Sequence, residues 1–226
     1  MRFLERPRGS ESRTVLPEIL DELPPDDPEA IRSRRDLRLI NFAMGNYRWV
    51  SQKMTGLRCE EPGLNWTEIG AGDGTLRHHL SAQARKTVHV TGVDLAPRPA
   101  HWPANWNWLQ GDLFDHLDST PEGGLFACLF LHHFQKSTLQ QIGRKLSRFR
   151  RLLFSEPARY PIHHWQGLAT RPFVNRVTRH DLHISINAGF RPGELEGALG
   201  LSRDQWQIHE HRTWMGALRF EARRLD

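Results

Sequence analysis

Short, mostly apolar runs rich in β-branched and aromatic residues recur through the middle of the chain and predict buried strands. They cover residues 65–69, 87–94, 106–113, 125–134 and 151–157. Helical periodicity lies between some of these runs. In 137–146, Leu139, Ile142 and Leu146 repeat at three- and four-residue steps behind Ser137, the expected N-cap. Strands that alternate with helices predict a parallel sheet with right-handed crossovers.

The last third of the chain predicts a helix followed by a pair of strands. Residues 158–178 look irregular and aromatic, and a helix should then begin with Thr178 as its N-cap and end with Gly189 as its C′ residue. Two further apolar runs, 205–210 and 213–222, are separated by a short turn. They are therefore expected to pair antiparallel.

An extension of mostly helical character precedes the first strand. A short helical turn is expected within 15–23, and Asp27 and Pro28 supply an N-cap and an N1 residue for a helix over 28–55, interrupted near Gly45. The apolar face expected for this helix consists of Leu37, Ile40, Phe42, Met44, Tyr47 and Trp49. We divide the chain into the extension, residues 1–60, and a main domain, residues 61–226. The extension either covers a ligand site as a lid or packs on the sheet edge, and both readings stay open.

The first run ends in a glycine-rich turn that predicts a ligand cradle. Glu68 is followed by Gly70, Gly72 and Gly74, and a helix is expected over 74–85. Glycine permits positive φ and leaves the backbone bare, and a helix N-terminus offers unpaired N–H groups. The third glycine of a dinucleotide fingerprint would fall at Thr75, which disfavours a dinucleotide oxidoreductase. A carboxylate at position 68 would repel a pyrophosphate but could hold a cationic group.

This pattern resembles motif I of the class I S-adenosylmethionine (SAM)-dependent methyltransferases. The resemblance implies an α/β, Rossmann-like doubly wound sheet of seven strands, mostly parallel with an antiparallel last strand. It implies that Glu68 is linked, usually through water, to the methionine amino group of SAM. The backbone of Gly70, Ala71, Gly72 and Gly74 would run along the methionine and ribose.

Later strand ends extend the same resemblance. Asp94 ends the second run, where a carboxylate can accept both ribose hydroxyls. Asp112, after the third run, matches a residue that often accepts the adenine amino group in the family. The remaining expected cofactor contacts are Leu95, Gly111, Leu113 and Leu131.

The proline-rich loop between the second and third runs departs from the family. Three prolines in 95–103 make a regular crossover helix doubtful there. We expect the clustered Trp102, Trp106 and Trp108 to pack beneath this loop, and stacking on adenine or substrate is the alternative.

His132 and His133 follow the fourth run, at the sheet edge where ligands bind in open α/β folds. Histidine can remove a proton near neutral pH, so either residue could be a base toward the acceptor. The alternative is a structural turn with imidazoles bonded to backbone.

The residues around the histidines limit which class of methyl acceptor is expected. An Asn/Asp-Pro-Pro-aromatic run, typical of amino-group methylation, is absent here, and Cys128 lies too early for cytosine-C5 chemistry. The resemblance to ubiquinone/menaquinone-type enzymes implies O- or C-methylation of a phenolic, quinone or polyketide-like small molecule. The alternatives are an RNA- or protein-directed methyltransferase and a non-catalytic methyltransferase-like binding module.

Composition limits the expected partners, location and metal content of the protein. The 226 residues carry 31 Lys and Arg against 26 Asp and Glu, a net charge of +5, with arginine clusters that permit but do not favour nucleic-acid binding. No apolar run approaches 18 residues, so no membrane insertion is expected. Two cysteines, Cys59 and the buried Cys128, suit a reducing cytoplasm. The histidine pairs lack metal-ligand spacing, so no metal site is expected. Oligomeric state does not follow from the sequence.

Overall fold

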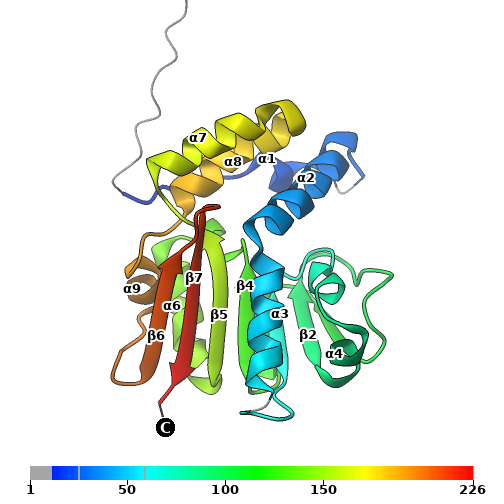
Figure 1. Cartoon of the computed structure of the whole chain (residues 1–226), viewed down its shortest axis with the longest axis vertical. Coiled ribbons are helices and arrows are strands. Elements are labelled where there is room, and N and C mark those ends of the chain that lie inside the picture. Colours follow the sequence, from blue (N-terminus) through cyan, green and yellow to red (C-terminus); the bar gives the residue numbers. More distant parts are fainter. Residues whose placement is uncertain (1–11, 25, 59, 226) are drawn as a thin grey trace, which may run out of the picture.

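The computed structural model describes residues 12–24, 26–58 and 60–225, so Cys59 and the first 11 residues lie outside it. Within these residues the chain forms one sheet of seven strands in the order β3-β2-β1-β4-β5-β7-β6 (Figure 1). The strands are β1 (Trp66–Ile69), β2 (Val90–Asp94), β3 (Asn107–Gln110), β4 (Gly124–Cys128), β5 (Arg151–Pro157), β6 (Trp206–Arg212) and β7 (Ala217–Arg224). No helix in the described part of the chain is long and apolar enough to cross a membrane.

The strand pairing confirms the fold class predicted from the sequence. Strands β1 to β5 pair in parallel, whereas β7 runs antiparallel to both β5 and β6. Strand β5 occupies the predicted range 151–157, and the two last strands form the predicted antiparallel pair.

Helices cover both faces of the sheet (Figure 1). On one face, α3 (Asn46–Leu57) and α4 (Ala82–Thr87) enclose a core that includes Trp49, Trp66 and Phe126. On the other, α5 (Leu113–His116), α6 (Lys136–Lys145) and α9 (Glu194–Leu199) enclose a larger core around Leu125, Phe154 and Phe220. Cys128 is buried, as predicted.

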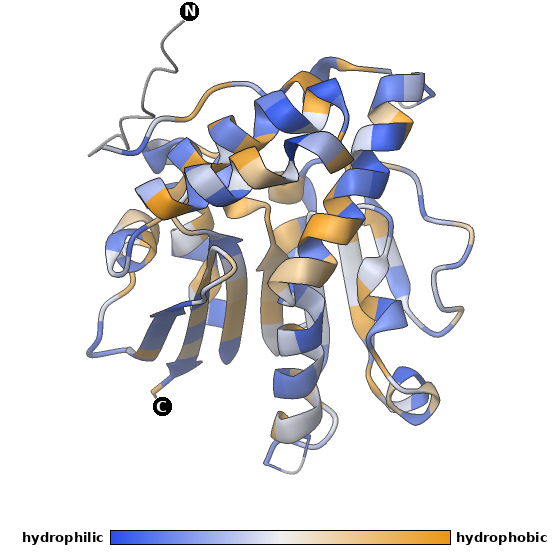
Figure 2. Ribbon diagram, turned by 45° about the horizontal axis from the view of Figure 1, so that its top comes forward, coloured by the Kyte–Doolittle hydropathy of each residue, from blue (hydrophilic) through white to orange (hydrophobic). Residues whose placement is uncertain are grey.

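Four further helices form a cap over the carboxyl ends of the central strands (Figure 1). They are α1 (Ile19–Glu22), α2 (Pro28–Met44), α7 (Pro161–Thr170) and α8 (Arg176–Ala188). Figure 2 shows polar and apolar residues interspersed along these helices. The extension thus lies over the sheet edge at which ligands bind in open α/β folds.

The N-terminal helix forms with the predicted cap and break. The Asp27 side chain accepts hydrogen bonds from the backbone N–H groups of Glu29 and Ala30, and Pro28 is the first helical residue. Gly45, with φ 67°, separates α2 from α3.

The predicted apolar face of this helix is wrong for α2. Phe42 is 72% exposed, and the residues that α2 buries against α8 include polar Ser33 and Asp36. Ser33 Oγ lies 2.9 Å from Thr178 Oγ1, which donates in turn to Asp36 Oδ2. Hydrogen bonds between buried polar groups therefore hold α2 to α8.

Three helix predictions need correction. The expected helix over 74–85 is broken into a 3₁₀ turn, η1 (Thr75–His78), and α4, because the Ser81 side chain caps a new helix start by accepting from Ala84 N–H. Residues 158–178, expected to be irregular, contain α7, which has Pro161 at N1. Helix α6 begins one residue before Ser137 without a side-chain cap.

Helix α8 also begins and ends differently from expectation. Asn175, not Thr178, caps it by accepting from Thr178 N–H, so Thr178 lies inside the helix. Gly189 ends the helix in an extended conformation rather than a left-handed one. A Cβ at Gly189 would lie 2.3 Å from the Pro157 carbonyl oxygen, so close backbone approach explains this glycine.

The proline-rich loop between β2 and β3 contains no helix in the described residues, as the sequence predicts. Trp102 and Trp106 are 4% and 2% exposed, and the ring centroids of Trp102 and Trp108 lie 4.9 Å apart. The indole N–H groups of Trp102 and Trp106 donate to backbone carbonyls. The tryptophans thus form the packing layer that was predicted beneath this loop.

Close packing of α6 on α9 gives a test of the fold. A Cβ at Gly143 would lie 1.8 Å from the backbone oxygen of Leu199, whereas Gly197, also helical, would meet nothing within 4 Å. We expect Gly143→Ala to lower the free energy of unfolding by roughly 1–3 kcal/mol through overpacking. Gly197→Ala should leave it unchanged or raise it by about 0.5 kcal/mol. Urea unfolding measures both, and equal effects would contradict this packing.

Candidate functional site

The predicted cofactor residues gather at one edge of the sheet. Glu68 lies on β1, Asp94 ends β2, and Asp112 follows β3, so three acids lie at the carboxyl ends of adjacent parallel strands. The strand order reverses between β1 and β4, which is where open α/β sheets place their ligand crevice.

Each glycine of the turn after β1 has its own physical reason. Gly70, Gly72 and Gly74 have φ of 66°, 53° and 71°, so all adopt the left-handed region that favours glycine. A Cβ at Gly70 would lie 2.2 Å from the Phe130 ring, and one at Gly74 would lie 2.8 Å from Trp102. A Cβ at Gly72 would meet no protein atom within 4 Å. The backbone at Gly72 is therefore open to a ligand, whereas Ala71 buries its side chain in the core beneath.

Asp94 fastens this turn to the end of β2. Its carboxylate accepts hydrogen bonds from the backbone N–H of Gly72 at 2.7 Å and of Ala96 at 2.8 Å. Each carboxylate oxygen has two lone pairs, so acceptor capacity remains for a further donor.

Glu68 is buried beneath the turn without a hydrogen-bond partner. Its side chain is 0% exposed, and neither carboxylate oxygen accepts a hydrogen bond of good geometry, although the Tyr47 hydroxyl lies close enough to affect its pKa. Burial raises the pKa of Glu68 well above its ordinary value, and the nearby Tyr47 hydroxyl opposes that shift only in part. A buried polar group without a partner is costly. The unpartnered carboxylate and the open backbone at Gly72 together fit a cationic ligand with polar groups to bind.

The remaining predicted contacts differ in how they could reach a ligand. Asp112 is exposed and caps α5 by accepting from Phe114 N–H, while Gly111 before it has φ 149°. Leu95 is 74% exposed beside Asp94. Leu113 and Leu131 are buried in the core, so only their backbones could contact a ligand. An open hollow of about 430 Å³ lies elsewhere, against β3, and no predicted site residue lines it.

Glu156, at the end of β5, organises the turn that carries the histidines. Its Oε1 accepts from the backbone N–H groups of Phe130 and Leu131 at 3.1 and 2.9 Å. Its Oε2 accepts from His132 N–H at 3.2 Å and lies 2.9 Å from His132 Nδ1. The carboxylate is 0% exposed, and it holds the 3₁₀ turn η3 (Leu131–His133) in place.

The two histidines have opposite electrostatic environments. Burial lowers the pKa of His132, but the hydrogen bond to Glu156 and the negative charges of Glu156 and Glu18 outweigh burial and raise it to about 9. His133 is partly exposed, and burial together with the charge of His132 lowers its pKa to about 4. At neutral pH His132 is therefore protonated, whereas His133 is neutral and can accept a proton.

A strap formed by residues 13–22 of the extension lies over these histidines. Arg13 Nη2 donates to the His132 carbonyl oxygen at 2.7 Å, and its Nε donates to Ala188 O at 2.7 Å. Asp181 of α8 accepts from Ile19 and Leu20 N–H and so caps α1. The strap brings Glu18, 6% exposed, to 3.6 Å from His132 Nε2, and Asp21 Oδ2 to 3.5 Å from His133 Nδ1.

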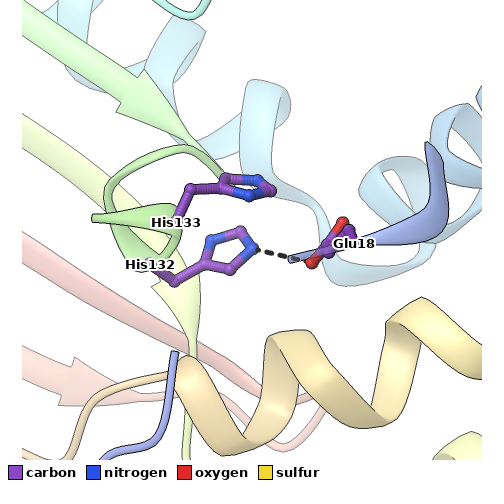
Figure 3. Close-up of side chains that lie close together, drawn as sticks. All are labelled: Glu18, His132 and His133. Atoms are coloured by element: carbon purple, nitrogen blue, oxygen red, sulfur yellow. Dashed lines mark ion pairs between the residues drawn. The ribbon is translucent and has the colours of Figure 1, made fainter. Parts of the chain in front are cut away.

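Three side chains from the strap and the turn converge (Figure 3). One ligand-type atom from each of Glu18, His132 and His133 lies within 4.8 Å of the others. The sequence places the histidines together but gives no sign of Glu18, because its contact spans more than 110 positions. Glu156 carries one local signal in the sequence, because it is an acid near the end of a predicted buried strand.

The Glu156–His132 pair predicts a pH-dependent stability. Because the folded pKa of His132 is raised from 6.5 to about 9, its contribution is full below pH 6.5 and is lost as pH rises toward 9. That shift corresponds to at most roughly 3 kcal/mol. We expect the free energy of unfolding to fall more between pH 6 and pH 9 in the parent than in Glu156→Gln. Urea unfolding at both pH values measures this, and an equal fall in both proteins would refute the pairing.

Comparison with known proteins supports the fold. No protein-family model and no curated protein sequence matches the chain. The plantazolicin methyltransferase BpumL, solved with SAH, is 11% identical with a TM-score of 0.68, and the match covers 89% of this chain and 92% of that chain. The plantazolicin methyltransferase BamL, with a triazolic desmethylPZN analog and SAH, gives 10% identity, a TM-score of 0.68 and coverages of 91% and 92%. Human N-acetylserotonin methyltransferase, solved with SAM, is 12% identical with a TM-score of 0.51, and the match covers 91% of this chain and 61% of that chain. The chain therefore has the fold of these methyltransferases.

Proposed function

We propose that the chain transfers a methyl group from SAM to a small-molecule acceptor, by O- or C-methylation of a phenolic, quinone or polyketide-like compound. One observation carries the proposal: a fully buried carboxylate, Glu68, accepts no hydrogen bond of good geometry from the protein and lies beneath a turn whose backbone at Gly72 is open. A ligand with a cationic amino group beside polar atoms would pair with the Glu68 carboxylate and bind the open backbone at Gly72. The fold likeness to proteins solved with SAH or SAM supports the same ligand.

The chain's residues would divide the cofactor between them. Glu68 would neutralise the amino group, and the bare backbone of the glycine turn would lie along the methionine and ribose. Asp94 would accept the ribose hydroxyls while it continues to hold Gly72. Asp112, exposed at the end of β3, would accept from the adenine amino group. Bound SAM supplies an already activated methyl group, so the protein mainly has to align the acceptor with it.

The acceptor side would lie at the histidine turn under the helical cap. His133 is neutral at physiological pH and partly exposed, so it can take a proton from an acceptor hydroxyl as methylation proceeds. His132, held by Glu156 and protonated, would position its neighbour and contribute positive charge. Phe130 and Phe134 are partly exposed beside the turn, with ring centroids 5.1 Å apart, and offer an apolar wall to an aromatic acceptor.

The alternatives find less support. One arginine cluster of the sequence spans residues 144–151. Within it, Arg148 donates to the carbonyl oxygens of Leu117 and Thr120, and Arg151 pairs with Glu61. These arginines are engaged within the protein, which weakens the case for an RNA- or protein-directed methyltransferase. A non-catalytic module stays the second alternative. The names of the similar proteins give two different acceptors, so the fold likeness does not select one.

Exchange of the unpartnered carboxylate tests the cofactor site. Glu68→Gln keeps the size of the side chain and cannot ionise, so the ligand-free protein no longer contains a buried acid whose pKa burial raises and should melt at the same or a higher temperature. Its affinity for SAM should nevertheless fall at least tenfold, about 1.4 kcal/mol. Glu221→Gln is the control, because Glu221 lies on distant β7 and pairs with Lys53. Isothermal titration and thermal melts measure both quantities, and parental SAM affinity in Glu68→Gln would remove the assignment.

Loss of the neutral histidine tests the acceptor side. With a panel of phenols and quinols and radiolabelled SAM, we expect the parent to methylate at least one compound. His133→Ala should lower kcat at least tenfold and change SAM affinity less than twofold, because the imidazole would act on the acceptor and not on the cofactor. Unchanged kcat would make His133 structural, and transfer to RNA or protein in place of the panel would favour the alternative class.

A further inference from the structure

The histidine turn and the strap carry the geometry of a metal site, which goes beyond the methyl transfer proposed above. We propose that Glu18, His132 and His133 bind one divalent first-row transition metal ion of the Zn²⁺ type. Ligand-type atoms of all three lie within 4.8 Å of one another (Figure 3). The sequence predicts no metal site because it shows only local spacing, whereas this set joins adjacent histidines to a residue of the distant extension.

The separation between Glu18 and His132 fits two ligands of one ion. Glu18 Oε1 lies 3.6 Å from His132 Nε2, which is too long for a good hydrogen bond. Two ligand atoms bound to one tetrahedral Zn²⁺ at about 2.0–2.1 Å lie about 3.4 Å apart. Small side-chain movements would therefore bring both atoms to bonding distance.

The surroundings of His132 match those of a metal-bound histidine. Such a histidine usually donates its other ring N–H to a carboxylate, which fixes the tautomer and leaves the second nitrogen for the ion. Nδ1 of His132 lies 2.9 Å from Glu156 Oε2, and that carboxylate also accepts three backbone N–H groups. Asp21 Oδ2 is 3.5 Å from His133 Nδ1, a looser instance of the same arrangement.

Charge around the cluster favours a cation. Glu18 and Glu156 are 6% and 0% exposed, and Asp21 and Asp181 lie close to them. Arg13 is a positive group that faces them, Arg159 lies close to Arg13, and His132 adds a charge when protonated. Glu156 is already satisfied by its four donors, and Glu18 Oε1 accepts from Ser185 Oγ, so a divalent ion would replace only the positive charge that the His132 proton supplies. With three protein ligands, a fourth position stays open to an acceptor oxygen.

The ion would change how the acceptor loses its proton. In the metal-bound chain both histidines are ligands, and a hydroxyl bound at the open position would be acidified by the ion. His133 would act as the base only in the metal-free chain. Loss of His133 lowers turnover in either state, so turnover alone does not test this inference.

Metal binding by the full-length, tag-free chain tests the proposal directly. After treatment with EDTA and dialysis, we expect the parent to bind about one equivalent of Zn²⁺ or Co²⁺, measured by isothermal titration and mass spectrometry of bound metal. Glu18→Gln and His133→Ala should each lose at least tenfold in affinity, and Glu156→Gln should lose about 10–100-fold. His183→Ala is the control, because His183 belongs to another stacked pair, with ring centroids 5.3 Å from His164, and should bind like the parent.

Two results would overturn the site. One is a parent chain that binds no more metal than the Glu18→Gln/His133→Ala double variant, and the other is an equal loss in His183→Ala. Because a variant could fail to fold, imidazole NMR signals of the parent provide a second readout: Zn²⁺ should shift those of His132 and His133 and leave those of His164 and His183 in place. SAM titration of the metal-free and the loaded chain keeps the two proposals apart, since SAM binding without metal binding removes only the metal site.

Discussion

Carboxylates buried at the carboxyl edge of a sheet need hydrogen-bond donors or positive charge, and the rest of this structure follows from how that need is met. Glu156 is fully satisfied: three backbone N–H groups and the His132 ring surround it, and they fix the turn after β4. Glu68 lies on β1, which β4 separates from the β5 strand of Glu156; it is equally buried and accepts no hydrogen bond of good geometry. The hydrogen-bonding capacity of Glu156 is thus used within the protein, whereas that of Glu68 remains available to a ligand. Under the proposed function, Glu156 would support the acceptor side and Glu68 would bind the cofactor.

The extension connects these two sides. Arg13 and Glu18 of the strap contact the histidine turn. Arg38 of α2 pairs with Asp73 of the glycine turn, with 2.8 Å between Nη1 and Oδ2. Polar contacts of Ser33 and Asp36 with Thr178 seat α2 on α8. Of the two roles left open by the sequence, we propose that of a lid over the predicted ligand site. A lid held by hydrogen bonds and exposed ion pairs can release more readily than one held by a large apolar contact.

The sequence predicts those features that local chemistry dictates. Strand periodicity, the glycines that require positive φ, the Asp27 cap and the break at Gly45 all act within a few residues, and the structure contains them. Features decided by distant contacts escaped it. Phe42 matches an apolar helix face yet is exposed, because α2 packs through polar residues. Asn175 competes successfully with Thr178 for the cap of α8, and Glu18 reaches His132 only through the folded strap. The roles of the predicted site residues stay predictions, although the structure brings their strand ends to one edge.

The central claim is that the edge formed by Glu68, the glycine turn and Asp94 is a SAM site. Isothermal titration of the unmodified full-length chain with SAM, followed by SAH, tests it most directly, because it requires neither a known acceptor nor a metal. The account predicts saturable binding of one equivalent per chain with a dissociation constant in the micromolar range or below, about −8 kcal/mol or stronger. The absence of binding heat at several buffer conditions and temperatures, from a folded chain, would contradict it.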